Sequence, residues 1–159
     1  MQSREFTFDH TAGIRISRNL RECDVSELVG VTRRDMGTGF VWYSIPCSES
    51  DTTNIQFSLC FHSGILDSIS LAVCDAALGS SWSDWSEDKE RMRAKLTEDW
   101  LAANGYTTGS YHWGEIWAGY DPKGASGGGG IKYSSEQIAV ADRDEHHCFT
   151  PTTLQSPGG

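Results

Sequence analysis

The fold follows from residues 54–74, which read Asn54-Ile-Gln-Phe-Ser-Leu-Cys-Phe-His-Ser-Gly64-Ile-Leu-Asp-Ser-Ile-Ser-Leu-Ala-Val-Cys74. On both sides of Gly64, apolar and polar residues alternate with the period of two that a half-buried strand requires. A short loop that ends in glycine is typical of a β-hairpin. The register that a three-residue loop predicts sets Phe57 opposite Ile69. It leaves one misfit, Leu59 opposite Asp67, which we expect a β-bulge to absorb.

Shorter segments of the same character precede this hairpin. Alternating residues predict strands over 5–8 and 14–18, and a run of aromatic and β-branched residues predicts a third over 40–45. Between them, Asp24 resembles a helix N-cap and Gly30 a helix stop. We therefore expect a helix of one or two turns between the second and third strands.

A longer helix is predicted over residues 87–103. Its apolar positions recur every four residues and include Met92 and Trp100, so one face is apolar and requires a sheet to cover. Ser86 or Asp84 is the expected N-cap, and acidic residues in the first turn suit the positive end of the helix dipole.

The next segment predicts a final hairpin. Alternation predicts one strand over 111–120, with Trp113 and Trp117 on the same face. Residues 121–130 are rich in glycine, which predicts a long flexible loop. They do not match a phosphate-binding loop, because the glycines are followed by no Gly-Lys-Ser/Thr motif and open no helix. Residues 131–133 form the expected returning strand.

The order of these elements defines the fold class. Strands and helices do not alternate regularly, which disfavours a parallel sheet. We therefore predict an α+β fold, a mainly antiparallel sheet of about five to seven strands with helix 87–103 packed on one face. The chain of 159 residues is short enough for one domain, which we place at 1–141 with residues 138–140 as a possible edge strand. Residues 142–159 are polar and predict a loosely ordered tail.

Charge excludes several classes of partner. Thirteen basic and 22 acidic residues give a net charge of -9, which would repel the phosphates of nucleic acids. No apolar run is long enough to span a membrane, and the first residues lack the apolar core of a secretion signal. We therefore expect a soluble cytoplasmic protein with neither a nucleic-acid nor a membrane partner.

The cysteines lead to the same expectation. There are five, an odd number without a CxxC pair, which indicates reduced thiols. The densest group of potential metal ligands is 144–148, which contains His146, His147 and Cys148. Because no second cluster matches it, we expect no metal site there beyond adventitious binding, and no cofactor.

Two constellations suggest catalysis. Cys60 and His62 share the polar face of one strand, a spacing that suits a thiolate and its base. Glu115 lies between Trp113 and Trp117, and carboxylates flanked by aromatic rings resemble a sugar-cleaving site. The catalytic alternative is therefore a small hydrolase or ligand-binding domain that uses the polar sheet face around His62, Cys60 and Glu115.

A third pattern combines tryptophans with acids around the helix. Aromatic side chains anchor protein interfaces, and clustered carboxylates steer a basic partner. The alternative interpretation is that the tryptophans close one end of the core while the acids cap the helix. The candidate partner-binding residues are Trp82, Asp84, Trp85, Glu87, Asp88, Glu90, Trp113, Glu115 and Trp117.

The residues that carry a resemblance read Trp82-Ser-Asp-Trp-Ser-Glu-Asp-Lys-Glu90, Trp100-Leu101 and Tyr111-His-Trp-Gly-Glu-Ile-Trp-Ala-Gly-Tyr-Asp-Pro122. Over residues 70–134, the chain resembles small bacterial immunity proteins of contact-dependent and type VI secretion toxin systems. The resemblance implies a non-enzymatic protein that binds and neutralises a cognate toxin. Such families share a role rather than one fold, so no binding residue is carried over. A phage or effector protein that inhibits a host protein is a further alternative.

Overall fold

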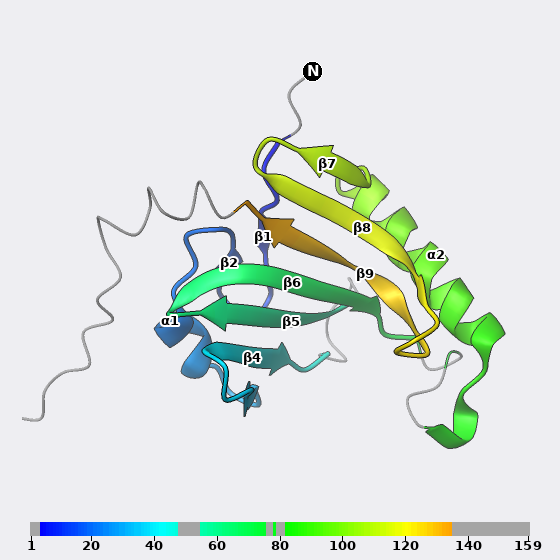
Figure 1. Ribbon diagram of the computed structural model, residues 1–159, viewed down its shortest axis with the longest axis horizontal. Helices are drawn as coiled ribbons and strands as arrows, with labels where there is room; N and C mark the ends of the chain where they lie inside the picture. Colours follow the sequence, from blue (N-terminus) through cyan, green and yellow to red (C-terminus); the bar gives the residue numbers. More distant parts are fainter. Residues whose placement is uncertain (1–3, 48–54, 76–77, 79–81, 135–159) are drawn as a thin grey trace, which may run out of the picture.

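The computed structural model describes residues 4–47, 55–75, 78 and 82–134, and these form an α+β fold (Figure 1). The main sheet has seven antiparallel strands in the order β3-β4-β5-β6-β9-β8-β7. The predicted fold class is confirmed. The strands of this sheet are β3 (Thr32–Asp35), β4 (Phe40–Ile45), β5 (Ile55–His62), β6 (Ile65–Val73), β7 (Gly109–Tyr111), β8 (Gly114–Asp121) and β9 (Ser126–Tyr133). The remaining elements are β1 (Phe8–Asp9) paired with β2 (Arg15–Ile16), α1 (Glu22–Ser26), the 3-10 turn η2 (Trp82–Asp84) and α2 (Glu87–Ala103).

The central hairpin, β5 with β6, is confirmed, but its register differs from the prediction. Its turn has two residues, Ser63 and Gly64, both with positive φ (53° and 80°), as a two-residue hairpin turn requires. Asp67 is the extra residue of a β-bulge, because Cys60 pairs with Ser68 and Phe61 with Leu66. The bulge expected at this position is therefore present. Phe57 consequently faces Leu71, two residues beyond its predicted partner. A shift of two leaves the side chains beyond the bulge on their predicted faces, whereas Leu66, between the turn and the bulge, lies opposite Phe61 and is buried.

Two segments of the chain, helix α2 and the N-terminal segment, cover the apolar face of the sheet. Helix α2 packs against β9, β8 and β6, which confirms that it covers one face (Figure 1). The N-terminal segment covers the neighbouring strands: the Phe8 ring lies 5.1 Å from Phe57 and 5.2 Å from Trp100, measured between centroids. These aromatic contacts join the N-terminal segment, the sheet and α2 in one core.

The prediction of a flexible loop over 121–130 is wrong for residues 126–130, because they belong to strand β9. All four of its glycines, 127–130, are buried in the sheet, where they allow close packing on both faces. A Cβ on Gly127 would lie 1.7 Å from the carbonyl oxygen of Glu90 in α2, so only glycine fits against the helix. On the other face, a Cβ on Gly130 would lie 2.6 Å from the Trp117 indole. The glycines are therefore packing residues.

The predicted single strand 111–120 is also wrong, because a turn at residues 112–113 divides it into β7 and β8. Gly114 has φ 155°, and a Cβ there would lie 2.1 Å from the Lys132 carbonyl oxygen. The turn moves Trp113 out of the alternation and into the core, where it is 1% exposed and stacks on Tyr111 at 5.4 Å. Trp113 is thus not on the surface beside Trp117.

The prediction of reduced thiols is wrong as well. Cys47 and Cys74 form a disulfide, with Cα atoms 6.8 Å apart. The sheet order explains the pairing. Strands β4 and β6 are both antiparallel to β5, so they run in the same direction, and Cys47 and Cys74 follow their last residues on the same side of the sheet. Cys23 is also disulfide-bonded, whereas Cys60 is a buried free thiol.

Smaller differences concern the ends of elements. The N-terminal strands are shorter than the predicted 5–8 and 14–18, and α1 begins at Glu22, before the expected Asp24 cap. Strand β3 was not predicted. The expectations for 138–140, for the 142–159 tail and for His146, His147 and Cys148 lie outside the described residues. No helix in the described part of the chain has the length and apolar character needed to cross a bilayer.

Candidate functional site

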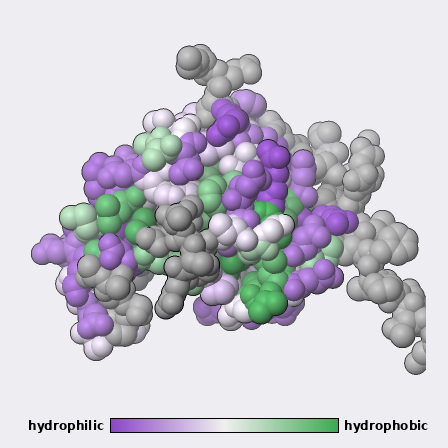
Figure 2. All heavy atoms as spheres, turned by 180° about the vertical axis from the view of Figure 1, so that it is seen from behind, coloured by the Kyte–Doolittle hydropathy of each residue, from purple (hydrophilic) through white to green (hydrophobic). Residues whose placement is uncertain are grey.

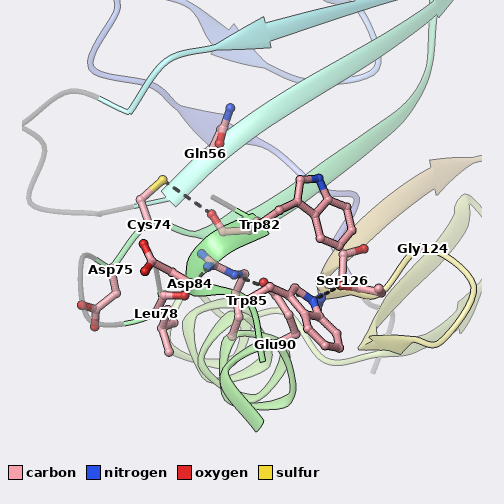
Figure 3. A pocket seen from close by; sticks show the side chains of 14 residues that line it. Gln56, Cys74, Asp75, Leu78, Trp82, Asp84, Trp85, Glu90, Gly124 and Ser126 are labelled. Atoms are coloured by element: carbon pink, nitrogen blue, oxygen red, sulfur yellow. Dashed lines mark hydrogen bonds and ion pairs between the residues drawn. The ribbon is translucent and has the colours of Figure 1, made fainter. Parts of the chain in front are cut away.

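A groove of about 690 Å³ lies where η2 and the start of α2 meet the ends of β5 and β6 and the β8–β9 turn (Figure 3). This volume is within the range of roughly 300 to 1,000 Å³ that is typical of ligand sites. The groove brings together four of the nine candidate residues: Trp82, Asp84, Trp85 and Glu90. It adds Gln56 and Ser126 from distant parts of the chain, and Asp75 and Arg93 from nearer ones.

Two tryptophans form the aromatic part of this groove. Trp82 is 79% exposed and Trp85 39%, and their rings lie 6.4 Å apart at an interplanar angle of 37°. The Nε1 of Trp85 donates a 2.7 Å hydrogen bond to the carbonyl of Ala125 in the β8–β9 turn. In Figure 3 the two indoles lie on the same side as Ser126, while Asp75 and Cys74 lie on the other. Trp85 is thus held by the scaffold while Trp82 presents most of its surface to solvent.

The start of α2 positions the acidic residues. The Ser86 side chain accepts a hydrogen bond from the backbone N–H of Lys89 at 3.2 Å, which confirms Ser86 as the N-cap. The Lys89 Nζ donates to the backbone carbonyl of Asp84 at 2.9 Å and so fastens η2 to the helix. Glu87 and Asp88 follow in the first turn, exposed and outside the groove lining.

The Glu90 side chain makes its contacts inside the protein and has a structural role. Its carboxylate pairs with Arg93 at 3.1 Å, and both side chains are only 14% exposed. The same carboxylate accepts the Gly127 backbone N–H at 3.0 Å. Arg93 also donates to the carbonyls of Val73 and Leu78, at 2.6 and 3.3 Å. Glu90 and Arg93 therefore connect α2 to the sheet and form a fixed wall of the groove.

The other candidates lie elsewhere. Trp113 is in the core. Trp117 is 46% exposed, and its indole lies across Gly130 on the sheet face opposite α2. Glu115, two residues earlier on the same strand, shares that face and lies opposite Lys132. None of these three lines the groove.

The structure does not bring together the residues of the catalytic alternative. Cys60 pairs with Ser68 on the next strand. Ser68 in turn pairs with Lys132, and Lys132 with Glu115, so that this row crosses four adjacent strands. At the usual spacing between strands, Cys60 and Glu115 are about 14 Å apart. Burial raises the pKa of the Cys60 thiol, and His62 stacks on an aromatic ring of β4 with centroids 4.3 Å apart. Cys60, His62 and Glu115 therefore form no common site.

The remaining surface is mixed in character. Seen from behind, hydrophilic side chains separate the hydrophobic patches rather than framing one apolar face (Figure 2). Among the described residues, no three His, Cys, Asp or Glu side chains are grouped closely enough to hold a metal ion. In the groove, exposed aromatic surface and carboxylates occur together.

Sequence reasoning missed several groove residues. Arg93 had a local signal, since a residue three positions after Glu90 lies on the same side of a helix. Gln56 and Ser126 had none, because only the order of strands in the sheet brings them to η2.

No protein-family model, curated protein or solved structure matches this chain.

Proposed function

We propose that this protein binds and neutralises a cognate antibacterial toxin as a stoichiometric inhibitor, in the manner of an immunity protein. The observation that supports the proposal is the groove, which Trp82 and Trp85 line with exposed indole surface and which Asp75 and Asp84 also line. Exposed tryptophans at a concave site are typical anchors of protein interfaces.

Charge favours a basic toxin. The chain carries a net charge of -9, and Glu87 and Asp88 are exposed beside the groove. Such a field accelerates encounter with a positively charged protein and orients it before contact. Glu87 and Asp88 would therefore act in steering, whereas Trp82 and Trp85 would supply most of the binding free energy.

The disulfide bears on the compartment. Disulfides persist in oxidising compartments and are rare in the cytoplasm. The Cys47–Cys74 disulfide therefore supports the proposal that neutralisation takes place in an oxidising compartment, in place of the cytoplasmic location expected from reduced thiols.

If a candidate toxin gene lies beside the gene for this protein, co-expression of the two tests the proposal. We expect growth to be restored and a complex of fixed stoichiometry to co-purify. Restored growth without a complex would instead indicate an enzyme that reverses the toxin's effect. Binding to a host protein, with no protection against the toxin, would favour the phage or effector alternative.

A further inference from the structure

We propose that the outer edge of β8, residues 117–121, binds an extended segment of a protein partner as an additional antiparallel strand, with a bulky apolar side chain over Gly119 and a basic side chain directed at Glu98. The inference goes beyond the proposed function, because residues other than those of the groove form this edge, and any protein that presents such a segment would fit it. It requires unpaired backbone groups, room for side chains and a matching charge.

Strand β8 has an open outer edge because β7 is shorter. β7 pairs only with residues 114–116, whereas residues 117–121 continue beside α2 (Figure 1). The opposite edge of the sheet, β3, carries the charged side chains of Arg33 and Arg34, and charges of this kind protect an edge strand from pairing. Residues 117–120 include neither a charged residue nor a proline, so the β8 edge lacks this protection.

This edge presents unpaired backbone groups. Hydrogen-bonded and non-bonded pairs alternate along antiparallel strands. The Ser134 N–H donates to the Trp113 carbonyl oxygen at 2.8 Å, and the register continues from this pair, so the odd-numbered residues of β8 bond to β9. The N–H and C=O groups of Ala118 and Tyr120 therefore point outward, where no described strand pairs with them. An extended chain supplies donors and acceptors at this alternate spacing.

Both faces of the edge have room for side chains. On the face away from α2, a Cβ on Gly119 would meet no atom within 4 Å. The neighbouring pair shows how a glycine on this face is covered, since the Trp117 indole lies across Gly130, directly opposite on β9. By the same geometry, a bulky side chain opposite Gly119 would lie across it. On the other face, a cavity of about 220 Å³ lies between α2 and the edge.

Charge favours a basic residue on the α2 side. The helix lines the cavity with Arg91, Lys95 and Glu98. Arg91 and Lys95 each pair with a carboxylate of the same helix, at 2.7 and 3.0 Å, whereas Glu98 is exposed and makes no ion pair within the described residues. Ala118 lies level with Glu98, since a Cβ on its partner in β9 would lie 3.2 Å from the preceding helix residue, Thr97. A lysine or arginine opposite Ala118 would therefore complement Glu98.

A second copy of this chain fits the edge less well. Pairing the edge with itself about a twofold axis would bring together two molecules that each have a net charge of -9. Such a pairing centred on Gly119 would also set this glycine opposite its own copy, and no side chain would cover either one. The observations therefore favour a segment of another protein in which a bulky apolar residue stands next to a basic one.

Titration of isotope-labelled protein with synthetic peptides, followed by NMR of the backbone amides, tests the inference. The probe is acetyl-Ser-Thr-Val-Phe-Lys-Thr-Ser-amide, in which Phe would lie opposite Gly119, Val opposite Tyr120 and Lys opposite Ala118. One control peptide is N-methylated at Val and Lys, which removes the two donors that face β8. The other is N-methylated at Phe and at the Thr after Lys, whose N–H groups face away.

We expect the probe and the second control to shift the amide signals of Ala118 and Tyr120 and to leave Arg34, on the opposite edge, unmoved. The first control should bind about tenfold or more weakly, the effect of two lost hydrogen bonds. Equal binding of the two N-methylated peptides, or shifts confined to other parts of the protein, would overturn the inference.

Protein variants identify the contacts. Gly119→Val should fold, because its Cβ meets no atom, but should weaken probe binding about fivefold by filling the space for Phe. Glu98→Gln should weaken binding about threefold, whereas Glu27→Gln, which changes an exposed carboxylate on the distant α1, should not. Full affinity in both Gly119→Val and Glu98→Gln would overturn the placement of the segment. Circular dichroism checks that each variant is folded.

The outcome is independent of the proposed function. If the toxin is bound and neutralised but no peptide binds, the strand site is wrong and the proposed function stands. If the probe binds as expected but the toxin is neither bound nor neutralised, the function is wrong and the strand site stands. A protein that forms a dimer in sedimentation equilibrium and binds no peptide would overturn the inference in favour of a second copy.

Discussion

The Trp85 indole donates a 2.7 Å hydrogen bond to the backbone carbonyl of Ala125, joining η2 to the β8–β9 turn across the groove. Ala125 has a φ of 51°, a conformation that non-glycine residues seldom adopt, so this carbonyl is presented by an unusual backbone geometry. One side of the groove is thus fixed by a contact between segments 40 residues apart.

Trp85→Phe removes this hydrogen bond and keeps an aromatic ring. We expect the free energy of unfolding to fall by about 1 kcal/mol, the usual net contribution of one hydrogen bond. Trp82→Phe is the matched control, since Trp82 is 79% exposed and should change stability by less than about 0.5 kcal/mol. Urea unfolding measures both, and equal effects of the two changes would show that the Trp85 bond contributes nothing.

Gly127→Ala should destabilise the protein by about 3 kcal/mol or more, because the added methyl group would strike the backbone of α2 at Glu90. Gly119→Ala is the control: it lies on the adjacent strand, and its added Cβ would meet no atom within 4 Å. Thermal unfolding compares the two variants. Similar melting temperatures would contradict the close packing of helix against strand.

Replacing both Cys47 and Cys74 by serine should lower the free energy of unfolding by about 3 to 4 kcal/mol, the entropic effect of opening a loop between residues 27 positions apart. Urea unfolding in non-reducing buffer provides the measurement, with Cys60→Ala as a variant that keeps the disulfide. Unchanged stability in the double variant would show that the two cysteines are not paired.

The Cys60 thiol should react slowly with iodoacetamide in the folded protein. Burial, and secondarily the negative charge of Asp67, raise the pKa of this thiol, and only the thiolate is a good nucleophile. At pH 8 we expect alkylation at least roughly a hundredfold slower than in urea. Mass spectrometry locates the adduct, and Cys60→Ala is the blank. Rapid labelling of the folded chain would revive the hydrolase alternative.

The sequence predicted the parts of the fold that depend on periodicity. Alternation over 54–74 identified the central hairpin, and the repeat through Met92 and Trp100 identified α2 with its bounds. The predicted apolar face of α2 was partly wrong, because Met92 is 51% exposed and the buried residues are Ala94, Thr97 and Leu101. Because a side chain's face depends only on whether a register shift is odd or even, the faces beyond the bulge were right although the pairing of Phe57 was shifted by two.

The remaining features depend on contacts that periodicity does not encode. The glycines of β9 carry no hydropathy signal, and their role is visible only beside Glu90 and Trp117. The turn that buries Trp113 is two residues long, and alternation continues across it in the sequence. The Cys47–Cys74 disulfide depends on the order of strands in the sheet. Predicting each hairpin separately does not give that order. The groove depends on that same order and was therefore found only in part.

The affinity of the purified toxin for the wild-type protein, Trp82→Ala and Met92→Ala, measured by calorimetry, tests the central claim most directly. Both side chains are exposed, at 79% and 51%, but only Trp82 lines the groove. We predict that Trp82→Ala costs about 2 kcal/mol or more, roughly a thirtyfold loss of affinity, and that Met92→Ala leaves the affinity unchanged. Equal affinities of all three proteins for the toxin, or no binding by the wild type, would contradict the account.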